Sequence, residues 1–555
     1  MSERIFIAVA WPYADGPLHL GHIAGAYLPS DIFARYHRIR GNKVLMVSGS
    51  DQHGTPITIK AEEEGKTPAE IAAKYHQQFL DSWRRLGISF DLFTSTGTAN
   101  HATVSQDIFL TLLNKGYIYK STVSQPYCPH CQRFLPDRYI EGTCPYCHFS
   151  GARGDQCDGC GKPLNPVELI NPYCRLCSTP PQFRDSEHLF FRLSAFRDRL
   201  LSWVRQQSHW RQNVLNFTTR YLEEGLRDRA ITRDIDWGVP VPIDGFENKR
   251  IYVWFEAVIG YLSATKEWAK SIGDEEGWRS FWQEETKSYY FIGKDNIPFH
   301  TIIWPAMLIG YGGLNLPYDV PANEFLTIEG KKLSTSRNWA VWLPDYLSRY
   351  EPDPLRYLLS INMPETADTD FSWREFVRRN NDELVATYGN LAHRVLTFVY
   401  RRFNGCVPKP GEIDSHSQTL INKAGDTLKS MDGLLYRCHF REAIRSAMSL
   451  AQEANRYLDE KSPWKIIEQD RQASATALYV ALSVLSCLRT ALYPFLPFSS
   501  QKLHQLLGFA GDVEDDGWKL HLPAPGQELA SPTPLFSKLD EKLVEEEAGR
   551  LGKSD

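Results

Sequence analysis

A strand, a loop and a helix follow one another within the first 40 residues, and this stretch constrains the fold most. Residues 5–10 read IFIAVA, an apolar run typical of a buried strand, and residues 23–40 have helical spacing with one proline, Pro29. Between them, residues 12–22 read PYADGPLHLGH. Open α/β sheets bind ligands at the carboxyl ends of their strands, so the chain is predicted to build a parallel sheet with its site at this loop.

The end of this loop has the residues of a phosphate site. His19 and His22 are three positions apart and would lie on the same side of one helical turn. Gly21 allows a ligand to approach the backbone, and the N–H groups of a helix start attract phosphate. Two structural histidines would give the same letters, but their position straight after the first strand favours a nucleotide site.

Two motifs together indicate a family. The HLGH stretch resembles the HIGH signature of the class I aminoacyl-tRNA synthetases, and residues 332–336, KLSTS, resemble the KMSKS loop of that family, with Gly330 and Lys331 before it. Thr335 stands where the family has a second lysine. The resemblance implies ATP-dependent activation of an amino acid, with His19, His22 and Lys332 as catalytic residues. It further implies ATP binding by residues of both signatures and of a third loop: His19, Gly21, His22, Gly293, Asp295, Lys331, Lys332, Ser334, Thr335 and Ser336.

Length and charge set the frame for this interpretation. A chain of 555 residues is too long for one core and favours three to four domains. The formal net charge is −5, so a nucleic acid would have to bind local basic patches. The N-terminus has no secretion signal pattern, and we find no window with about 18 apolar residues. We therefore expect a cytoplasmic protein without a membrane partner.

The cysteines give the most specific spacing in the chain. Eight of the 11 cysteines form four C-x-x-C pairs: Cys128/Cys131, Cys144/Cys147, Cys157/Cys160 and Cys174/Cys177. Each pair can donate two thiolates to a tetrahedral Zn²⁺, so we predict two structural zinc sites. A redox role is disfavoured, because redox motifs of this kind occur singly. Spacing alone permits several pairings. The resemblance implies a nested one, with the inner two pairs on one ion and the outer two on the other.

A second strand, Val44 to Ser48, ends at another polar loop that contains Asp51. Asp51 could simply cap the loop, but the resemblance implies that it receives the α-ammonium group of an amino acid. Two further stretches, residues 252–261 and 293–300, begin where predicted strands end, and both are rich in aromatic residues. An aromatic pocket without formal charge suits an unbranched or thioether side chain, because sulfur contacts aromatic rings favourably.

These stretches match the methionine-specific members of the class. The resemblance implies a methionine pocket made of residues from four segments: Ala10, Trp11, Tyr13, Asp51, Arg233, Trp254, Ala257, Val258, Tyr261, Asn296, Phe299 and His300.

Strand patterns stop near Phe371, and long helical patterns follow at residues 374–402, 418–431, 437–459 and 473–495. Asn390 and Arg394 fall on one stripe of the first, and Trp464 follows a helix break. A solvated face and a packed tryptophan would also explain them. The resemblance implies that Asn390, Arg394 and Trp464 read the anticodon, whose splayed bases stack on aromatic rings.

The predicted fold is a split Rossmann-like parallel sheet with a zinc-knuckle insert, followed by a helix bundle. The predicted boundaries are 1–117 and 230–329 for the two halves of the catalytic domain, 118–229 for the insert, 330–370 for the signature loop and stem-contact region, 371–515 for the bundle and 516–555 for a segment that packs back on the body. Since no oligomerisation domain follows, a monomer is expected.

The function that this resemblance implies is attachment of L-methionine to methionine tRNA, initiator and elongator, through methionyl-adenylate, with Mg²⁺ accompanying ATP. One alternative is a non-catalytic tRNA-binding paralogue, motivated by Thr335. The apparently complete ATP site argues against it. A relative acting on another apolar amino acid is disfavoured because the chain lacks room for a large editing insert, and a small adenylyltransferase does not fit the length.

Overall fold

A five-stranded parallel sheet forms the centre of the catalytic half in the computed structural model, which describes residues 2–155, 157, 159–160, 162 and 164–553. Its strand order is β14-β13-β1-β2-β3. The strands are β1 (Arg4–Val9), β2 (Lys43–Ser50), β3 (Leu92–Ser95), β13 (Lys287–Gly293) and β14 (Ala322–Asn323). The predicted parallel sheet is confirmed.

Both faces of β1 are buried, which explains its continuous apolar sequence. Ile5, Ile7 and Val9 join one core and Phe6 and Ala8 join another on the opposite face. Helices α2 (Leu28–Ile39) and α4 (Pro68–Leu86) belong to the first core. Helices α5 (Ala99–Asn114), α9 (Gly260–Ser271) and α11 (Trp304–Tyr311) belong to the second.

The predicted helix at residues 23–40 is present, with a different start. A short helix α1 (Leu20–His22) leads into a π-helical turn η1 (Ile23–Tyr27) and then into α2. Pro29 is accommodated because it lies in the first turn of α2, where its missing N–H is not needed.

Residues 250–255 and 324–328 also read as strands in the sequence, and both are present in shortened form outside the main sheet. Residues 250–255 give only β12 (Arg250–Ile251), which pairs antiparallel with β11 (Thr232–Arg233), and helix α8 (Val253–Glu256) begins directly afterwards. Residues 324–328 give β15 (Leu326–Ile328), which lies in a separate sheet with β16 (Lys331–Lys332) and β17 (Thr369–Phe371). The edge of the main sheet beside β13 is occupied by β14, so β15 pairs elsewhere.

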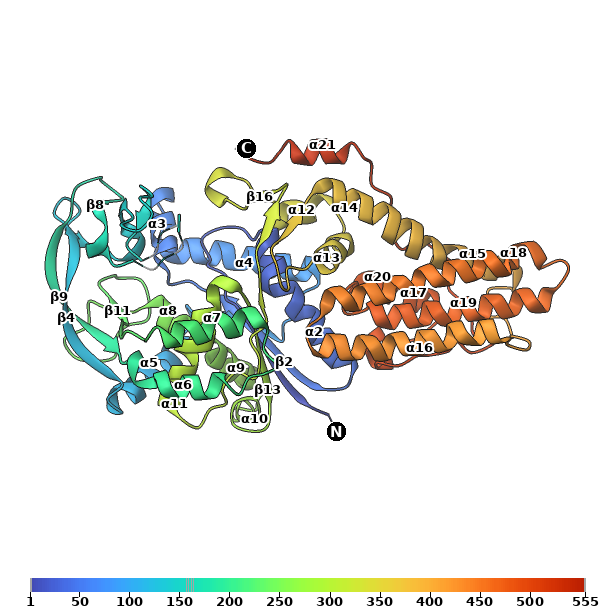
Figure 1. Ribbon diagram of the computed structural model, residues 1–555, viewed down its shortest axis with the longest axis horizontal. Coiled ribbons are helices and arrows are strands. Elements are labelled where there is room, and N and C mark those ends of the chain that lie inside the picture. Colours follow the sequence, from blue (N-terminus) through green and yellow to red (C-terminus); the bar gives the residue numbers. More distant parts are fainter. Residues whose placement is uncertain (1, 156, 158, 161, 163, 554–555) are drawn as a thin grey trace.

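The cysteine-rich insert is carried on two long antiparallel strands, β4 (Ile118–Cys128) and β9 (Gln182–Phe191), at the left of Figure 1. A second small sheet beyond them has the order β7-β6-β8. These are β6 (Ile140–Thr143), β7 (Ala152–Arg153) and β8 (Ile170–Cys174). The core around the cysteines is small, and four of its buried members are cysteines themselves.

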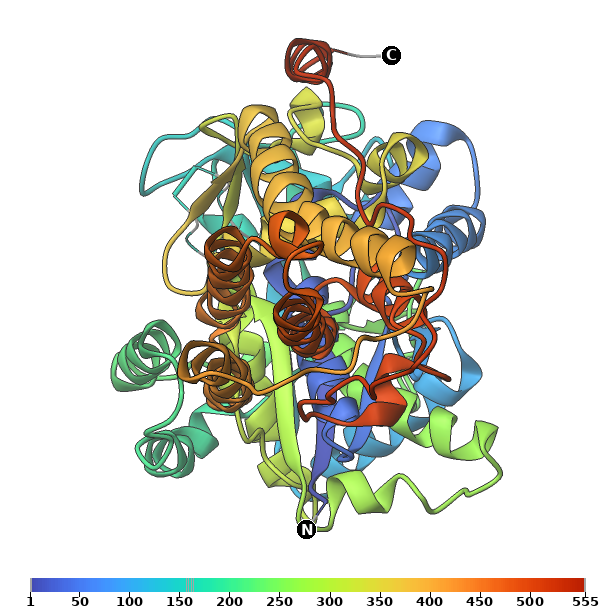
Figure 2. The ribbon, with the colours of Figure 1, turned by 90° about the vertical axis from the view of Figure 1, so that its right-hand side faces the viewer.

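The C-terminal half is a helix bundle, which lies at the right of Figure 1 and faces the viewer in Figure 2. All four predicted helical stretches are helical, with longer bounds at most ends. The helices are α14 (Trp373–Arg379), η9 (Asn380–Gly389), α15 (Asn390–Arg402), α16 (Ser415–Tyr436), α17 (Phe440–Lys461), α18 (Pro463–Ile466), α19 (Arg471–Leu492) and α20 (Pro497–Leu506).

Helix α19 is long and apolar enough to cross a membrane by composition, with a mean hydropathy of 1.6 over its best window. Our search of the sequence for an apolar window overlooked it. That window is wholly buried inside the protein, as expected for the central helix of a bundle.

The last described residues lie against the catalytic half. In α21 (Leu543–Ala548), Glu547 accepts hydrogen bonds from Arg349 Nη2 at 2.9 Å and from the Tyr350 hydroxyl at 2.8 Å. Beyond it, the Gly552 N–H donates to the Asn338 carbonyl at 3.0 Å, and both views place α21 at the rim of the molecule (Figures 1 and 2).

Candidate active site

The two signature segments lie against each other at the carboxyl end of β1. The Leu20 N–H donates to the Val341 carbonyl at 3.1 Å, and the Leu343 N–H donates to the Leu18 carbonyl at 2.7 Å. A Cβ on Gly21 would lie 2.7 Å from Leu333 Cδ1, so any larger residue would force a shift where the KLSTS loop crosses this turn. The fold thus brings together segments that are far apart in the sequence.

His19 and His22 form a stacked pair, with ring centroids 3.8 Å apart and an interplanar angle of 15°. The His19 N–H donates to His22 Nδ1 at 3.2 Å, which leaves the hydrogen of His22 on Nε2. Burial lowers the pKa of His19 to about 4, and burial together with His19 lowers the pKa of His22. Two neutral histidines can therefore donate hydrogen bonds to an anion at pH 7.

His19 Nδ1 is buried and has no hydrogen-bond partner among the described residues. A buried polar atom without a partner is costly, so it is suited to a bound ligand.

The KLSTS loop begins as a hairpin between β15 and β16, in which Thr327 pairs with Lys332 and Ile328 with Lys331. Lys331 Nζ lies 4.3 Å from the centre of the Trp339 ring. Lys332, Thr335 and Lys331 are all exposed, and the Ser334 hydroxyl accepts a hydrogen bond from Arg337 Nε at 3.1 Å. The side chain of Ser336 lies outside the described part of the chain.

Aromatic residues of the predicted methionine pocket contact one another and form an aromatic wall. Trp254 and Phe299 stack at 4.2 Å with an angle of 15°, and Tyr13 meets Trp254 edge-on at 6.0 Å. Trp11 meets Tyr261 edge-on at 6.4 Å. The structure thus brings together five aromatic residues predicted for the pocket.

Glycines make room for the Trp11 ring. A Cβ on Gly49 or on Gly260 would lie 2.4 Å and 2.7 Å from it, respectively. The ring therefore occupies a slot between β2 and the start of α9.

His300 holds the Tyr261 hydroxyl in place. Its Nδ1 lies 2.9 Å from the Asn296 carbonyl, which can only accept, so Nδ1 carries the hydrogen and Nε2 accepts from Tyr261 at 2.7 Å. Burial lowers the pKa of His300 to about 4, consistent with this neutral form. The remaining small pocket residues lie on the same segments: Ala10 directly follows β1, and Ala257 and Val258 follow α8.

Asp51 lies at the carboxyl end of β2 and is only 4% exposed. It forms a backbone bridge with Tyr13, and the Ala14 N–H donates to its carbonyl at 2.9 Å. Burial and the nearby Glu256 carboxylate raise the pKa of Asp51. A cationic ligand group beside it would relieve this unfavourable environment.

Arg233, predicted for the methionine pocket, contacts both the catalytic half and the insert. Its guanidinium lies 3.6 Å from the centre of the Tyr252 ring, and its Nε lies 3.3 Å from Asp137 of the insert. In the described structure it contacts these neighbours and the carbonyls of Ala230 and Thr232, so it joins the insert to the catalytic half.

Gly293 and Asp295 lie at the end of β13, where the chain turns into the short helix η6 (Lys294–Asn296). A Cβ on Gly293 would lie 2.7 Å from Asp295 Oδ1. Both residues therefore sit at the carboxyl edge of the sheet, beside β1.

The eight cysteines form two clusters, nested as the resemblance implied. The outer cluster is Cys128, Cys131, Cys174 and Cys177, and the inner cluster is Cys144, Cys147, Cys157 and Cys160. Within each cluster the sulfur atoms all lie within 4.8 Å of one another. A tetrahedron with Zn–S bonds of about 2.3 Å has edges of about 3.8 Å.

The sulfur–sulfur distances fit that tetrahedron. They are 3.5 Å for Cys128 and Cys177 and 3.9 Å for Cys144 and Cys160, far longer than a disulfide bond of about 2 Å. Peptide N–H groups also donate to sulfur, as from Gly159 to Cys157 at 3.3 Å. All eight thiols are free, so both clusters could each hold a metal ion.

The three predicted anticodon residues lie on two helices of the bundle, Asn390 and Arg394 on α15 and Trp464 on α18, which Figure 1 labels. Asn390 begins α15 and is exposed, and Arg394 lies one turn later. The Arg394 guanidinium lies 4.3 Å from the centre of the Trp464 ring. Stacked cationic and aromatic groups of this kind can bind unstacked bases.

Trp342 was missed by the sequence reasoning. Its backbone pairs with that of His19, and the two rings lie 6.0 Å apart. Its indole N–H donates to Asn338 Oδ1 at 2.7 Å, which ties it to the end of the signature loop. A tryptophan six residues after the KLSTS motif was the available signal.

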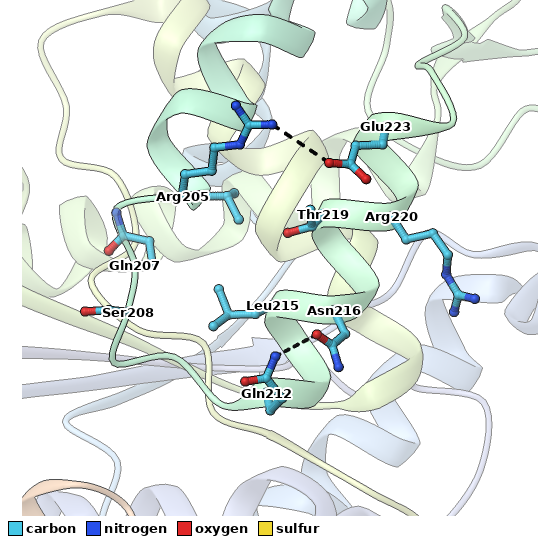
Figure 3. Close-up of a pocket in the computed structure, with 10 residues that line it drawn as sticks. Arg205, Gln207, Ser208, Gln212, Leu215, Asn216, Thr219, Arg220 and Glu223 are labelled. Atoms are coloured by element: carbon cyan, nitrogen blue, oxygen red, sulfur yellow. Dashed lines mark hydrogen bonds and ion pairs between the residues drawn. The ribbon is translucent and has the colours of Figure 1, made fainter.

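A separate groove of about 630 Å³ lies between α6 (Arg197–Val204) and α7 (Gln212–Glu223), as Figure 3 shows. Arg205 and Glu223 face each other across it, with 3.8 Å between Nη2 and Oε1. The residues that line this groove include none of those predicted for the site.

Comparisons with known proteins agree with this arrangement. The model of the family "tRNA synthetases class I (M)" matches residues 5–396, and that of the anticodon binding domain of methionyl tRNA ligase matches residues 407–554. The methionine–tRNA ligase of Dehalococcoides mccartyi strain BAV1 is 67% identical over 552 residues, which cover 100% of both chains. That of Thermomicrobium roseum is 54% identical, over 99% of both.

Among solved structures, Mycobacterium tuberculosis methionyl-tRNA synthetase in complex with methionyl-adenylate superposes with a TM-score of 0.80 at 27% identity. The match covers 97% of this chain and 100% of that one. The family models match both halves of the chain, and the relatives match its full length. The chain therefore belongs to the class I tRNA synthetases, in their methionyl branch.

Proposed function

We propose that this chain attaches L-methionine to methionine tRNA in two steps, through methionyl-adenylate. The observation that carries the proposal is the contact of the two signature segments, Gly21 against Leu333, beside an aromatic pocket that ends at buried Asp51. A nucleotide and an amino acid bound there would meet at the carboxyl edge of the sheet.

In the first step, a methionine carboxylate oxygen attacks the α-phosphorus of ATP, and the bond to the bridging oxygen of the β-phosphate breaks. His19 and His22 would donate hydrogen bonds to the phosphates, and Lys332 would follow the leaving pyrophosphate. Asp295 would bind the ribose and Asp51 the methionine ammonium group. The protein orients the reactants and stabilises charge, with no covalent enzyme intermediate.

In the second step, a hydroxyl of the terminal ribose of tRNA attacks the methionyl carbonyl carbon, and AMP leaves. Asn390, Arg394 and Trp464 would hold the anticodon at the far end of the bundle. Support for this comes from the stacking of Arg394 on Trp464 and from the exposure of Asn390. Initiator and elongator methionine tRNAs share this anticodon and would both be substrates.

Zinc is the metal that suits the two cysteine clusters best, because tetrahedral thiolate sites select it. The outer and inner clusters would each hold one ion, which would stabilise an insert with little apolar core of its own. Neither site has a role in the chemistry. Mg²⁺ would enter with ATP as part of the substrate.

We further propose that the protein is located in the cytoplasm and is a monomer. Eight thiols arranged for metal binding are typical of a reducing compartment. Light scattering of the purified protein at micromolar concentration measures the oligomeric state directly, and a mass of twice 63.6 kDa would refute the monomer.

Pyrophosphate exchange into ATP with methionine, isoleucine, valine and homocysteine tests the activity. We expect exchange that is fastest with methionine. The non-catalytic alternative, raised by Thr335, finds no support in a relative named as a ligase at 67% identity. If the protein bound tRNA but showed no pyrophosphate exchange with any of these amino acids, our proposal would be refuted and the non-catalytic alternative supported.

A further inference from the structure

A buried carboxylate lies beside the amino-acid pocket and has no part in the roles given above. Glu256, the last residue of α8, is 0% exposed. Its Oε1 lies 2.9 Å from His53 Nδ1, and its Oε2 bonds to His101 Nε2. Because a buried charge is costly unless its partners compensate for it, a site that retains this one needs an explanation.

The carboxylate ties together three elements that surround the pocket. His53 lies in the loop after β2, and His101 lies in the first turn of α5. His101 Nδ1 also lies 2.9 Å from the Ser263 hydroxyl on α9. The His101 ring is 6.3 Å from that of Trp11, so this network borders the aromatic wall.

The same network reaches Asp51 through one peptide group. The N–H of His53 donates to Asp51 Oδ1 at 3.2 Å. Any rotation of this peptide would turn the carboxylate that faces the substrate's ammonium group. The side chain of His53 is fixed by Glu256, so the orientation of Asp51 depends on a residue that does not touch the substrate.

Charge adds to this geometric effect. Glu256 is paired with the two histidines, and they hold its pKa low against the opposing effect of burial. The resulting negative charge is one reason why the pKa of Asp51 is raised. A cation bound at Asp51 would therefore relieve the repulsion between Asp51 and Glu256.

We propose that Glu256 is a positioning residue for the amino-acid substrate, which fixes Asp51 through His53 and strengthens the binding of the substrate's α-ammonium group. This inference rests on the proposed function, because it assigns the ammonium group to Asp51.

The isosteric variant Glu256→Gln tests it in the full-length protein. Pyrophosphate exchange gives the KM values for methionine and ATP. The inhibition constant of 4-(methylthio)butanoate, which has the thioether and carboxylate of methionine but no amino group, reports the rest of the pocket. We expect the KM for methionine to rise about tenfold, the effect of losing one interaction with a charged group. The KM for ATP and the inhibition constant should change less than twofold.

Glu267→Gln is the matched control. This half-buried carboxylate on α9 accepts a hydrogen bond from Thr94 Oγ1 at 2.9 Å and does not join the network. It should leave all three constants unchanged. If Glu256→Gln does not fold, Ser263→Ala, which removes one partner of His101, carries the same test with an expected two- to threefold rise in the KM for methionine.

The outcomes separate the two proposals. Wild-type enzyme without methionine-dependent exchange would overturn both the proposed function and this inference. Active wild-type enzyme with an unchanged KM for methionine in Glu256→Gln would overturn only the inference. An equal rise in the KM and in the inhibition constant of the deaminated analogue would also overturn it, because the variant would then have disturbed the whole pocket.

Discussion

Gly21→Ala is the sharpest test of how the two signature segments meet. The added methyl carbon would lie 2.7 Å from Leu333 Cδ1 and 3.0 Å from His19 Cε1 and Nδ1. Favourable contacts between carbon atoms need about 3.5–4.0 Å. Either the KLSTS loop or the His19 ring must therefore move by roughly an ångström at the place where ATP is proposed to bind.

The size of the effect follows from this overlap. Overpacking costs about 1–3 kcal/mol, but Leu333 is half-buried and can rotate, so we place the cost near the lower end. If this cost, about 1–2 kcal/mol, is lost entirely from transition-state stabilisation, kcat/KM for ATP should fall about five- to 30-fold. Overall stability should change little, because alanine is a better helix former than glycine by about 1 kcal/mol.

Pyrophosphate exchange at varied ATP and saturating methionine measures kcat/KM, and thermal unfolding measures stability. Gly25→Ala is the matched control. Gly25 lies in the next helical turn, η1, and its added carbon would have no atom within 4 Å outside its chain neighbours and its own helix backbone. We expect the control to retain wild-type activity. A Gly21→Ala enzyme within twofold of wild type, or an equal loss in the control, would refute the reasoning.

Four further predictions concern other parts of the chain. Lys332→Ala should slow adenylate formation at least tenfold in single-turnover assays, as expected for a lost charged hydrogen bond. The hypothesis that Lys331 compensates for Thr335 requires a comparable loss of rate in Lys331→Ala. An unchanged rate in that variant would refute the hypothesis. Trp464→Ala should raise the KM for tRNA about five- to 150-fold, by the loss of base stacking, and leave pyrophosphate exchange unchanged. Elemental analysis should find two zinc ions per chain, and a serine in either cysteine cluster should remove one of them. Burial lowers the pKa of His37 to about 3, below its value of about 6.5 in the unfolded chain. As the pH falls, the unfolded state therefore binds this proton before the folded state does. The stability that the neutral ring contributes is lost as the pH falls below about 6.5. By pH 5 this group alone should cost about 2 kcal/mol, and urea unfolding of wild type and His37→Gln at pH 7 and pH 5 should show the difference.

The strands and helices that the sequence predicted well are those with a strong local pattern. The apolar run of β1 and the long helices of the bundle each depend on residues a few positions apart. The strands expected at 250–255 and 324–328 form as the short β12 and β15 in sheets other than the main one, because a short apolar run does not reveal its partner. Only the packed sheet decides that β14, not β15, pairs with β13.

The candidate site divides in the same way. The family resemblance identified the KLSTS loop, and spacing along the chain identified the cysteine pairs and the two histidines. Spacing left the pairing of the cysteines open, and it could not reveal the bridge from His53 through Glu256 to His101. A single glutamate in an apolar stretch indicates a buried charge but not its partners.

By itself, the sequence determined which chemical groups this protein carries and the local backbone that presents them, because helical periodicity, turn residues and C-x-x-C spacing act over a few residues. The tertiary structure decided which of these groups meet. The contact of Gly21 with Leu333, the nesting of the two cysteine clusters and the burial of Glu256 all join residues distant in sequence. Such contacts form only when the whole core packs, since their free energy comes from excluding water from surfaces that no single segment supplies.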